Sequence, residues 1–203
     1  MDEKKYTAEN IQSLDGMEHV RLRPQLYFKE CFKENNLNSL VFGGLCHAID
    51  EYFDEACDEI IISFGEKFFN VKYNVGMSLE KSWDLTKAEC IMTKMGACSN
   101  EKKHLKVGDE FCHVGMTAIN AVSEKCELIT VFNKQQAHFV FEKGQTVFKE
   151  MIKDEISKNS TTINFEISPN IFGNLIFEFN DLHSKLNLLK EKLPKLKIKL
   201  YKL

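Results

Sequence analysis

Apolar and polar residues follow two periods along this chain, one typical of helices and one typical of strands. In residues 37–57 the apolar positions recur every three or four residues, which predicts one long amphipathic helix. Residues 59–64 and 68–73 are rich in β-branched and aromatic side chains and flank Gly65, so they predict a β-hairpin.

The remaining pattern predicts helices and strands that are interleaved. Helices are expected at residues 7–14, 16–24, 85–95, 113–123 and 180–192, and a polar loop is expected at 96–109. Strands are expected at residues 127–132, 138–142, 146–150, 161–167 and 195–201. Because several of these strands are hairpin-linked, we expect an α+β fold, a two-layer α/β sandwich whose mixed, mostly antiparallel sheet carries helices on one face.

Composition excludes several classes of protein. The 203 residues are 43% hydrophobic and 28% charged, which is globular composition and suits a single domain spanning residues 1–203. The formal net charge of -3 does not favour direct DNA binding. No apolar run reaches the roughly 18 residues of a membrane span, and the polar start is not a signal peptide. Seven cysteines without a secretory leader indicate reduced thiols in a cytoplasmic protein.

Several stretches carry a family likeness. Residues 11–27, which include the phrase from Leu14 to Tyr27, and residues 23–63 resemble the amino-terminal part of the DNA gyrase B and topoisomerase IV B subunits. Residues 88–93, 114–123 and 160–172 resemble later parts of the same domain. The resemblance implies a GHKL (Bergerat) ATP-binding fold over residues 1–203, with residues 1–27 as an amino-terminal arm. The family's transducer, toprim and DNA-gate regions would be absent.

The resemblance places the family's catalytic helix on residues that lack its chemistry. The family's glutamate base and its magnesium-binding asparagine fall on Gly43 and His47, and the adjoining aspartate falls on Cys46. Glycine cannot accept a proton, and a neutral imidazole is a poor Mg²⁺ ligand. Asp50 lies on the same helix in the degenerate pocket, and a slipped register would offer Glu51 as the base. We expect no bound metal.

The adenine-reading segment is altered too. The family's strand-end aspartate falls on Tyr73, and Val75 and Met77 stand where it has the glycines around Gly76. Side chains at these positions are expected to be strained if the backbone needs a positive φ. Asn74 remains as a substitute amide acceptor for adenine.

The family's glycine-rich lid aligns with residues 109–115. Three of the lid's four glycines are replaced in this chain, and Val114 and Gly115 end the stretch. Two of the replacements, Asp109 and Glu110, are negatively charged and would repel the phosphates of ATP. Lys106 and Thr162 remain as candidate phosphate contacts. ATP hydrolysis is therefore not expected, and no catalytic residue is assigned.

Other candidate chemistry has an ordinary structural interpretation. The cysteine spacings match no common zinc pattern, and Cys46 and His47, as helix neighbours, point in different directions. His104, His138 and His183 are expected on the surface. The alternating residues 195–202 predict either a phosphate-binding lysine stripe or a lysine-guarded edge strand, and we favour the edge strand.

These features predict a gyrase-B-like GHKL domain that has lost its nucleotide-binding and catalytic residues and serves as a non-catalytic interaction or regulatory module. The alternative is a divergent ATPase, for which ATP and Mg²⁺ would be the cofactors. A remodelled small-molecule pocket is a third possibility. The arm, with Arg21, Arg23 and Tyr27, is expected either to mediate a homodimer or contact with a topoisomerase B subunit, or to brace the domain's own sheet.

Overall fold

A computed structural model gives the fold of residues 15–82, 84–97, 102–112 and 114–203. The side chains of Ser82, Asp109 and Glu110 lie outside this description, as do the predicted helix 7–14 and His113. The helices are α1 Gly16–Leu22, α2 Pro24–Tyr27, α3 Lys29–Glu34, α4 Asn38–Gly44, α5 Cys46–Phe53, α6 Lys87–Thr93, α7 Asp109–Cys112, α8 Met116–Val122, α9 Pro169–Phe172 and α10 Phe179–Lys192, with a 3-10 turn, η2, at Lys103–Val107. The strands are β1 Glu59–Phe64, β2 Phe68–Tyr73, β3 Lys81–Ser82, β4 Leu85–Thr86, β5 Ser123–Phe132, β6 Gln135–Glu142, β7 Gln145–Lys153, β8 Ser160–Ile167 and β9 Lys197–Lys202.

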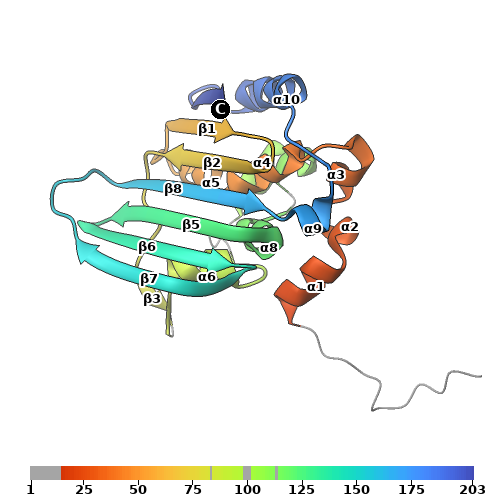
Figure 1. Cartoon of the computed structure of the whole chain (residues 1–203). Coiled ribbons are helices and arrows are strands. Elements are labelled where there is room, and N and C mark those ends of the chain that lie inside the picture. Colours follow the sequence, from red (N-terminus) through yellow and green to blue (C-terminus); the bar gives the residue numbers. More distant parts are fainter. Residues whose placement is uncertain (1–14, 83, 98–101, 113) are drawn as a thin grey trace, which may run out of the picture.

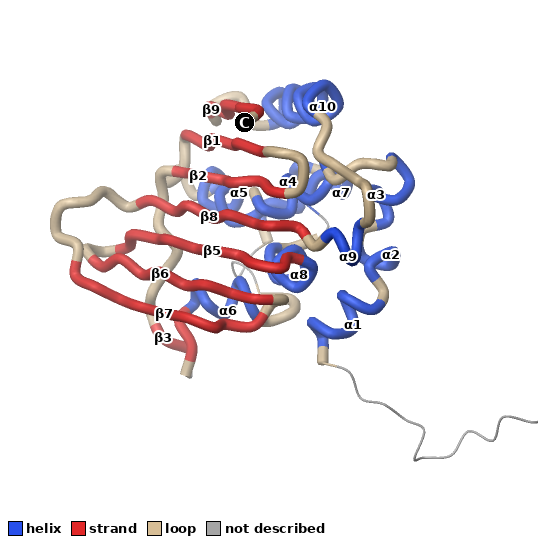
Figure 2. The backbone as a smooth tube through the Cα atoms, in the orientation of Figure 1, coloured by secondary structure: helices blue, strands red, loops and turns tan. Residues whose placement is uncertain are grey.

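One seven-stranded sheet organises the molecule. Its strand order is β7-β6-β5-β8-β2-β1-β9, and every pairing is antiparallel except the parallel one between β1 and β9. Figures 1 and 2 show α4, α5, α6 and α8 behind this sheet, while α10 lies along the β9 edge. The predicted α/β sandwich with a mostly antiparallel sheet is therefore confirmed.

The hydrophobic core lies between the sheet and these helices. Strands β1, β2 and β8 bury alternate residues, as period-two alternation requires, and the rings of Phe69 and Phe165 stack at 4.8 Å. Leu45 and Ile49 are fully buried on the helix side. The core thus fixes which face of each strand can reach the space between helix and sheet.

The hairpin has the predicted bounds, but the long helix does not. Residues 37–57 form two helices, α4 and α5, interrupted at Leu45. The break follows Gly43 and Gly44, where a Cβ atom would contact Val114 and Phe69 respectively at under 3 Å. Close packing of the helix on its neighbours therefore overrides the continuous apolar spacing.

Other boundaries differ because short-range contacts decide them. Pro24 does not close a helix but begins α2, since proline is favoured in a first turn. Leu85 pairs in the small β3–β4 sheet, so α6 starts only at Lys87, after its Thr86 cap. The predicted loop 96–109 includes η2. The last strand, β9, is an edge strand with exposed Lys197 and Lys199, as the lysine alternation predicts.

The described part of the arm packs on its own domain. The Arg21 guanidinium donates to the Ala121 carbonyl at 2.7 Å and lies 3.8 Å from the Glu124 carboxylate. His19 and Tyr27 share a hydrogen bond of 2.8 Å. Arg21 therefore braces the domain, whereas Leu22 and Leu26 are 65% and 68% exposed.

Candidate functional site

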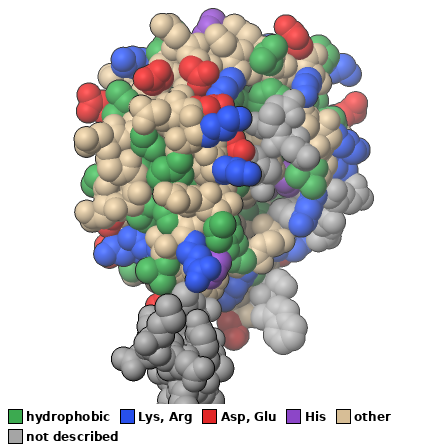
Figure 3. Space-filling view, turned by 90° about the vertical axis from the view of Figure 1, so that its right-hand side faces the viewer, with side chains coloured by type: hydrophobic (Ala, Val, Ile, Leu, Met, Phe, Trp, Pro, Cys, Tyr) green, Lys and Arg blue, Asp and Glu red, His purple; other side chains and the backbone are tan. Residues whose placement is uncertain are grey.

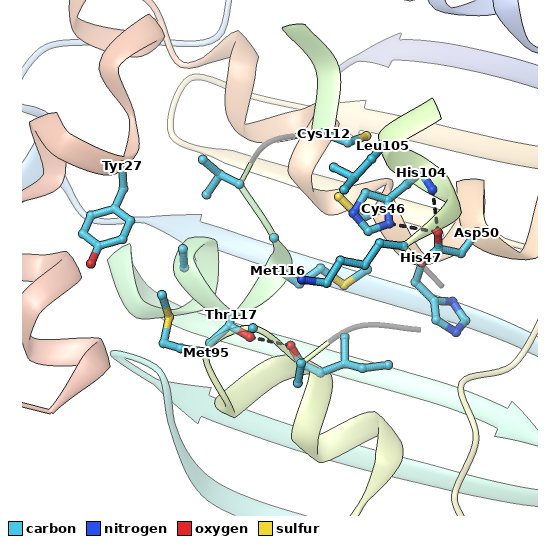
Figure 4. A pocket seen from close by; sticks show the side chains of 17 residues that line it. Tyr27, Cys46, His47, Asp50, Met95, His104, Leu105, Cys112, Met116 and Thr117 are labelled. Carbon is cyan, nitrogen blue, oxygen red and sulfur yellow. Dashed lines mark hydrogen bonds and ion pairs between the residues drawn. The ribbon is translucent and has the colours of Figure 1, made fainter. Parts of the chain in front are cut away.

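A cavity of about 350 Å³ lies on the helix side of the sheet. Figure 4 shows that α5, η2, α6 and α8 each contribute side chains to it, with Tyr27 of α2 on another side. Of the predicted site residues, Cys46, His47, Asp50, Val114 and Gly115 line this cavity, together with Ile91, Met95, Lys102, His104, Cys112, Met116 and Thr117 among others. The predicted helix and lid segments therefore do meet around one space.

Gly43 does not open into this cavity, because another segment covers it. A Cβ atom built on Gly43 would lie 2.3 Å from the Val114 carbonyl oxygen and 2.8 Å from Ile119 Cδ1. Both distances are below the 3.0 Å that real Cβ atoms respect. No side chain fits at position 43 while the segment after α7 keeps this path.

His47 and Tyr73 close the space between α5 and the sheet. Both side chains are buried, and His47 Nδ1 lies 3.2 Å from the Tyr73 hydroxyl oxygen. Burial lowers the pKa of His47 to about 4, against the opposing effect of Asp50. The imidazole is therefore neutral at pH 7, and its 3.7 Å approach to Glu51 is not an ion pair.

Asp50 is used for a contact within the chain. Its Oδ1 atom accepts hydrogen bonds from the His104 backbone N–H at 2.6 Å and from His104 Nδ1 at 2.9 Å (Figure 4). Both side chains are buried, so the prediction of a surface His104 is wrong. This pair ties η2 to α5 and holds the His104 ring in one orientation.

Within the predicted lid segment, residues 109–112 form the helix α7, which packs on the rest of the domain. Phe111 is buried against Phe42 with ring centroids 5.3 Å apart, and Cys112 Sγ donates to the Phe42 carbonyl at 3.6 Å. From α10, Lys192 Nζ donates to the Val107 carbonyl at 2.6 Å and lies 5.1 Å from the Phe111 ring centroid. Core and cation–π contacts thus replace the bare backbone that a phosphate-wrapping loop presents.

The strand-end residues serve the fold as well. Asn74 Oδ1 accepts from the backbone N–H groups of Asp58 and Glu59, both at 3.2 Å, so its amide is turned to the start of β1 and does not line the cavity. Val75 and Met77 have no positive φ, so the predicted strain is absent.

Gly76 is needed for a close approach between strands. A Cβ atom at this position would lie 2.0 Å from the Val131 carbonyl oxygen. The neighbouring Met77 N–H donates to Thr130 Oγ1 at 2.8 Å. The turn after β2 therefore packs directly on β5.

The two candidate phosphate contacts, Lys106 and Thr162, point elsewhere. Lys106 Nζ lies 5.4 Å from the Phe53 ring centroid, and Lys106 does not line the cavity. Along β8 it is Thr161 that is buried on the helix side, where it donates to the Val75 carbonyl at 2.8 Å. Thr162 faces the other way because side chains alternate along a strand.

Sequence reasoning missed several lining residues, His104, Cys112 and Thr117 among them. Thr117 Oγ1 donates to the carbonyls of Ile91 and Lys94, which joins α8 to the end of α6. His104 lies within the polar stretch 96–109, and no pattern along the sequence indicates its contact with Asp50, because only the tertiary fold brings the two residues together.

Metal-binding chemistry finds no support in the described residues. Over the part of the chain that the structure describes, no three His, Cys, Asp or Glu side chains gather so that they could hold a metal ion. The six described cysteines are free, and all but Cys90 are buried, as expected for structural thiols. In the described ranges no helix has both the length and the apolar character to cross a membrane.

Comparison with known proteins identifies relatives of the chain. It is 28% identical over 191 residues to the DNA gyrase B subunit of Rickettsia typhi, covering 91% of this chain and 24% of that protein. It is 25% identical over 218 residues to the type 2 topoisomerase B subunit of Aquifex aeolicus, and 27% identical over 200 residues to the DNA gyrase B subunit of Thermotoga maritima. These alignments cover 97% and 96% of this chain but only 25% and 31% of those proteins. No protein-family model matches the chain.

Proposed function

We propose that this chain, a homologue of the DNA gyrase and type 2 topoisomerase B subunits over about nine tenths of its length, is a GHKL-type domain that does not hydrolyse ATP and works as a protein-interaction or regulatory module. The chain spans only 24% and 25% of those two relatives' length, so the activity of the whole relatives is not carried over.

The observation that carries this proposal is the contact over Gly43. In the gapless register of the family resemblance, position 43 is where the catalytic glutamate would stand. The Val114 carbonyl lies 2.3 Å from the place of a Cβ atom there, so a carboxylate cannot be accommodated without moving backbone. A general base within hydrogen-bond reach of the attacking water contributes a rate gain of about 10²–10⁴-fold, which this site lacks at position 43.

The other groups needed for ATP and Mg²⁺ do not fit either. A neutral His47 bound to Tyr73 offers no oxygen to a hard cation. Asp50, the nearby carboxylate, accepts two hydrogen bonds from His104. Tyr73 fills the place of the adenine-reading aspartate, and Phe111 anchors the lid segment to α4. These contacts engage the groups that ATP and Mg²⁺ would need, and the cavity of about 350 Å³ beside them is left without those groups.

The arm and the charge distribution favour protein partners. Leu22 and Leu26 are exposed on α1 and α2, where a second copy or a topoisomerase B subunit could cover them. Figure 3 shows Lys and Arg side chains interspersed with Asp and Glu on this face of the molecule. Such mixing suits protein contacts better than a phosphate backbone, which calls for a basic stripe.

Calorimetric titration with a non-hydrolysable ATP analogue and Mg²⁺ tests the proposal. We expect no binding tighter than about 100 µM, which corresponds to roughly -5.5 kcal/mol. A gyrase B subunit in the same buffer serves as the positive control. Saturable binding with a dissociation constant below about 100 µM, or phosphate release above the blank, would establish the alternative of a divergent ATPase.

Light scattering tests the interaction role separately. The chain is measured alone and mixed with a gyrase B subunit, and the variant Leu22→Asp with Leu26→Asp is measured in parallel. We expect association that this variant loses. If the chain is monomeric alone and does not associate with the gyrase B subunit, the arm has no support as an interface.

A further inference from the structure

The two edges of the seven-stranded sheet are built differently. At one edge, β9 presents Lys197 and Lys199, and α10 packs beside it. Charged edge strands of this kind resist pairing with other chains. At the opposite edge, β7 exposes Val147, Phe148, Met151 and Ile152 by 44–54% each. A nine-residue edge strand with four half-exposed apolar side chains is the kind of edge that pairs with another strand.

The pairing of β7 with β6 fixes which way each side chain points. The register shifts at the level of Val140 and Phe141, which leaves Phe148–Lys153 as the regular part of the strand. Within it, Phe148 and Ile152 pair with partly buried Val140 and Gln136 on the face of the sheet away from the helices, and Met151 pairs with buried Ala137 on the helix face. An added strand would therefore meet apolar side chains on both faces.

A groove lies beside the start of the same strand. It has a volume of about 470 Å³ and is bounded by Gln145 and Thr146 of β7, Glu89 of α6 and Met17 of α1. Glu89 is buried and accepts from Thr146 Oγ1 at 3.0 Å and from Lys149 Nζ at 3.3 Å, which fixes β7 against α6. The edge is thus held rigid and already shaped, which lowers the entropic cost of binding.

We propose that β7 is a docking edge that receives an extended segment of another protein as an eighth, antiparallel strand. Main-chain hydrogen bonds to this edge, with which no strand among the described residues pairs on its outer side, would supply affinity, and the alternating side chains would supply specificity. This inference rests on the proposed interaction role and names the surface and the kind of partner for it.

The charges on β7 define the partner's pattern. Lys149 and Lys153 share the helix face, and Glu150 lies on the other face between Phe148 and Ile152. A partner strand that runs antiparallel to β7 meets Lys153 first and Phe148 last. To complement these six residues, its own side chains should be, in order, acidic, apolar, apolar, basic, acidic and apolar. Opposite charges and apolar pairs directly across an antiparallel ladder stabilise it.

A second copy of this chain fits the edge poorly. Two copies of β7 in one continuous sheet are related by a twofold axis through a single residue, which then faces itself. An axis at Lys149 or Lys153 opposes two lysines, and an axis at Glu150 opposes two glutamates. An axis at Met151 opposes Lys149 to Lys153 twice, and an axis at Ile152 opposes Glu150 to Asp154 twice. An axis at Phe148 would need regular pairing at Val147, where the strand is irregular. Like charges directly across a ladder are destabilising, so the symmetric registers of the regular part are disfavoured.

A synthetic peptide with the complementary pattern tests this proposal. Its binding to the full chain is followed by fluorescence anisotropy, beside a scrambled peptide of the same composition. We expect the complementary peptide to bind at least tenfold more tightly than the scrambled one, and its addition to shift amide NMR signals of Phe148–Lys153. Equal binding of both peptides, or shifts confined to the cavity on the helix side, would overturn the proposal.

Two variants make the test specific to this edge. Glu150→Lys should weaken binding about tenfold, and a peptide whose basic residue is replaced by glutamate should restore it. Ile152→Asp should also weaken binding, whereas Leu188→Asp, a change at a similarly exposed position on α10, should not. A dimer of the unbound chain that Ile152→Asp dissolves would overturn the choice of partner. The ATP titration reports on the helix side of the sheet, so failure of the proposed function and failure of this docking edge can be told apart.

Discussion

Position 43 offers the sharpest test of how closely the helices and the lid segment are packed. In Gly43→Ala, the new Cβ atom would lie 2.3 Å from a carbonyl oxygen that belongs to the backbone and cannot rotate away. Overpacking typically costs about 1–3 kcal/mol, and because backbone must move here we take the upper part of that range, about 2–3 kcal/mol. The better helix propensity of alanine returns about 1 kcal/mol. We therefore expect the free energy of unfolding to fall by about 1–2 kcal/mol.

Urea unfolding followed by circular dichroism measures this loss. With a denaturant slope of about 2 kcal/mol per M, the midpoint should drop by about 0.5–1 M. Gly115→Ala is the matched control, because no heavy atom lies within 4 Å of its Cβ position, and its midpoint should change less. If Gly43→Ala is as stable as the parent chain, the Val114 carbonyl does not cover position 43, and the main support for a blocked base site is lost.

Three further predictions follow from buried groups. Because burial lowers the pKa of His47 to about 4 from 6.5, the unfolded chain takes up this proton first, so stability should fall by up to about 3 kcal/mol as pH drops from 6.5 toward 4. His47→Gln should flatten that part of the urea-midpoint profile, and an unaltered profile would contradict the assignment. Asp50→Ala leaves the His104 N–H without its acceptor and should cost about 3 kcal/mol, whereas Asp50→Asn keeps an acceptor oxygen and should cost less; equal losses in thermal unfolding would speak against the contact. Burial raises the pKa of Cys57 to about 11, so native protein at pH 8 should label there with iodoacetamide far more slowly than urea-unfolded protein, as peptide mass spectrometry can show; comparable rates would refute the burial.

Much of the fold was predictable because local patterns and tertiary packing agree. The β1–β2 hairpin has the bounds that its pattern predicts, since β-rich runs flank Gly65 and buried and exposed positions alternate in both strands. The helix predicted over residues 37–57 failed because its apolar spacing runs on unchanged through the break. Only the approach of Val114 and Phe69 to Gly43 and Gly44 distinguishes the two helices, and no sequence period contains that contact.

The site was predictable in its outline and not in its contacts. Cys46, His47 and Gly115, which belong to two segments that the sequence analysis singled out, line one cavity. Asn74 and Thr162 do not, since the amide of Asn74 bonds to the start of β1 and strand alternation turns Thr162 away. The buried pair of Asp50 and His104 joins residues 54 positions apart, which spacing along the chain cannot anticipate.

The carbonyl of Val114 above Gly43 also bears on the history of this lineage. Placing an acid at position 43 would require the backbone at Val114 to move, and this segment directly follows Phe111 and Cys112, which pack on Phe42. A substitution at position 43 alone would therefore destabilise the fold without yet supplying a general base. Under the proposed function, the absence of an acid at position 43 could not be reversed by a single substitution, because the neighbouring backbone would have to change as well.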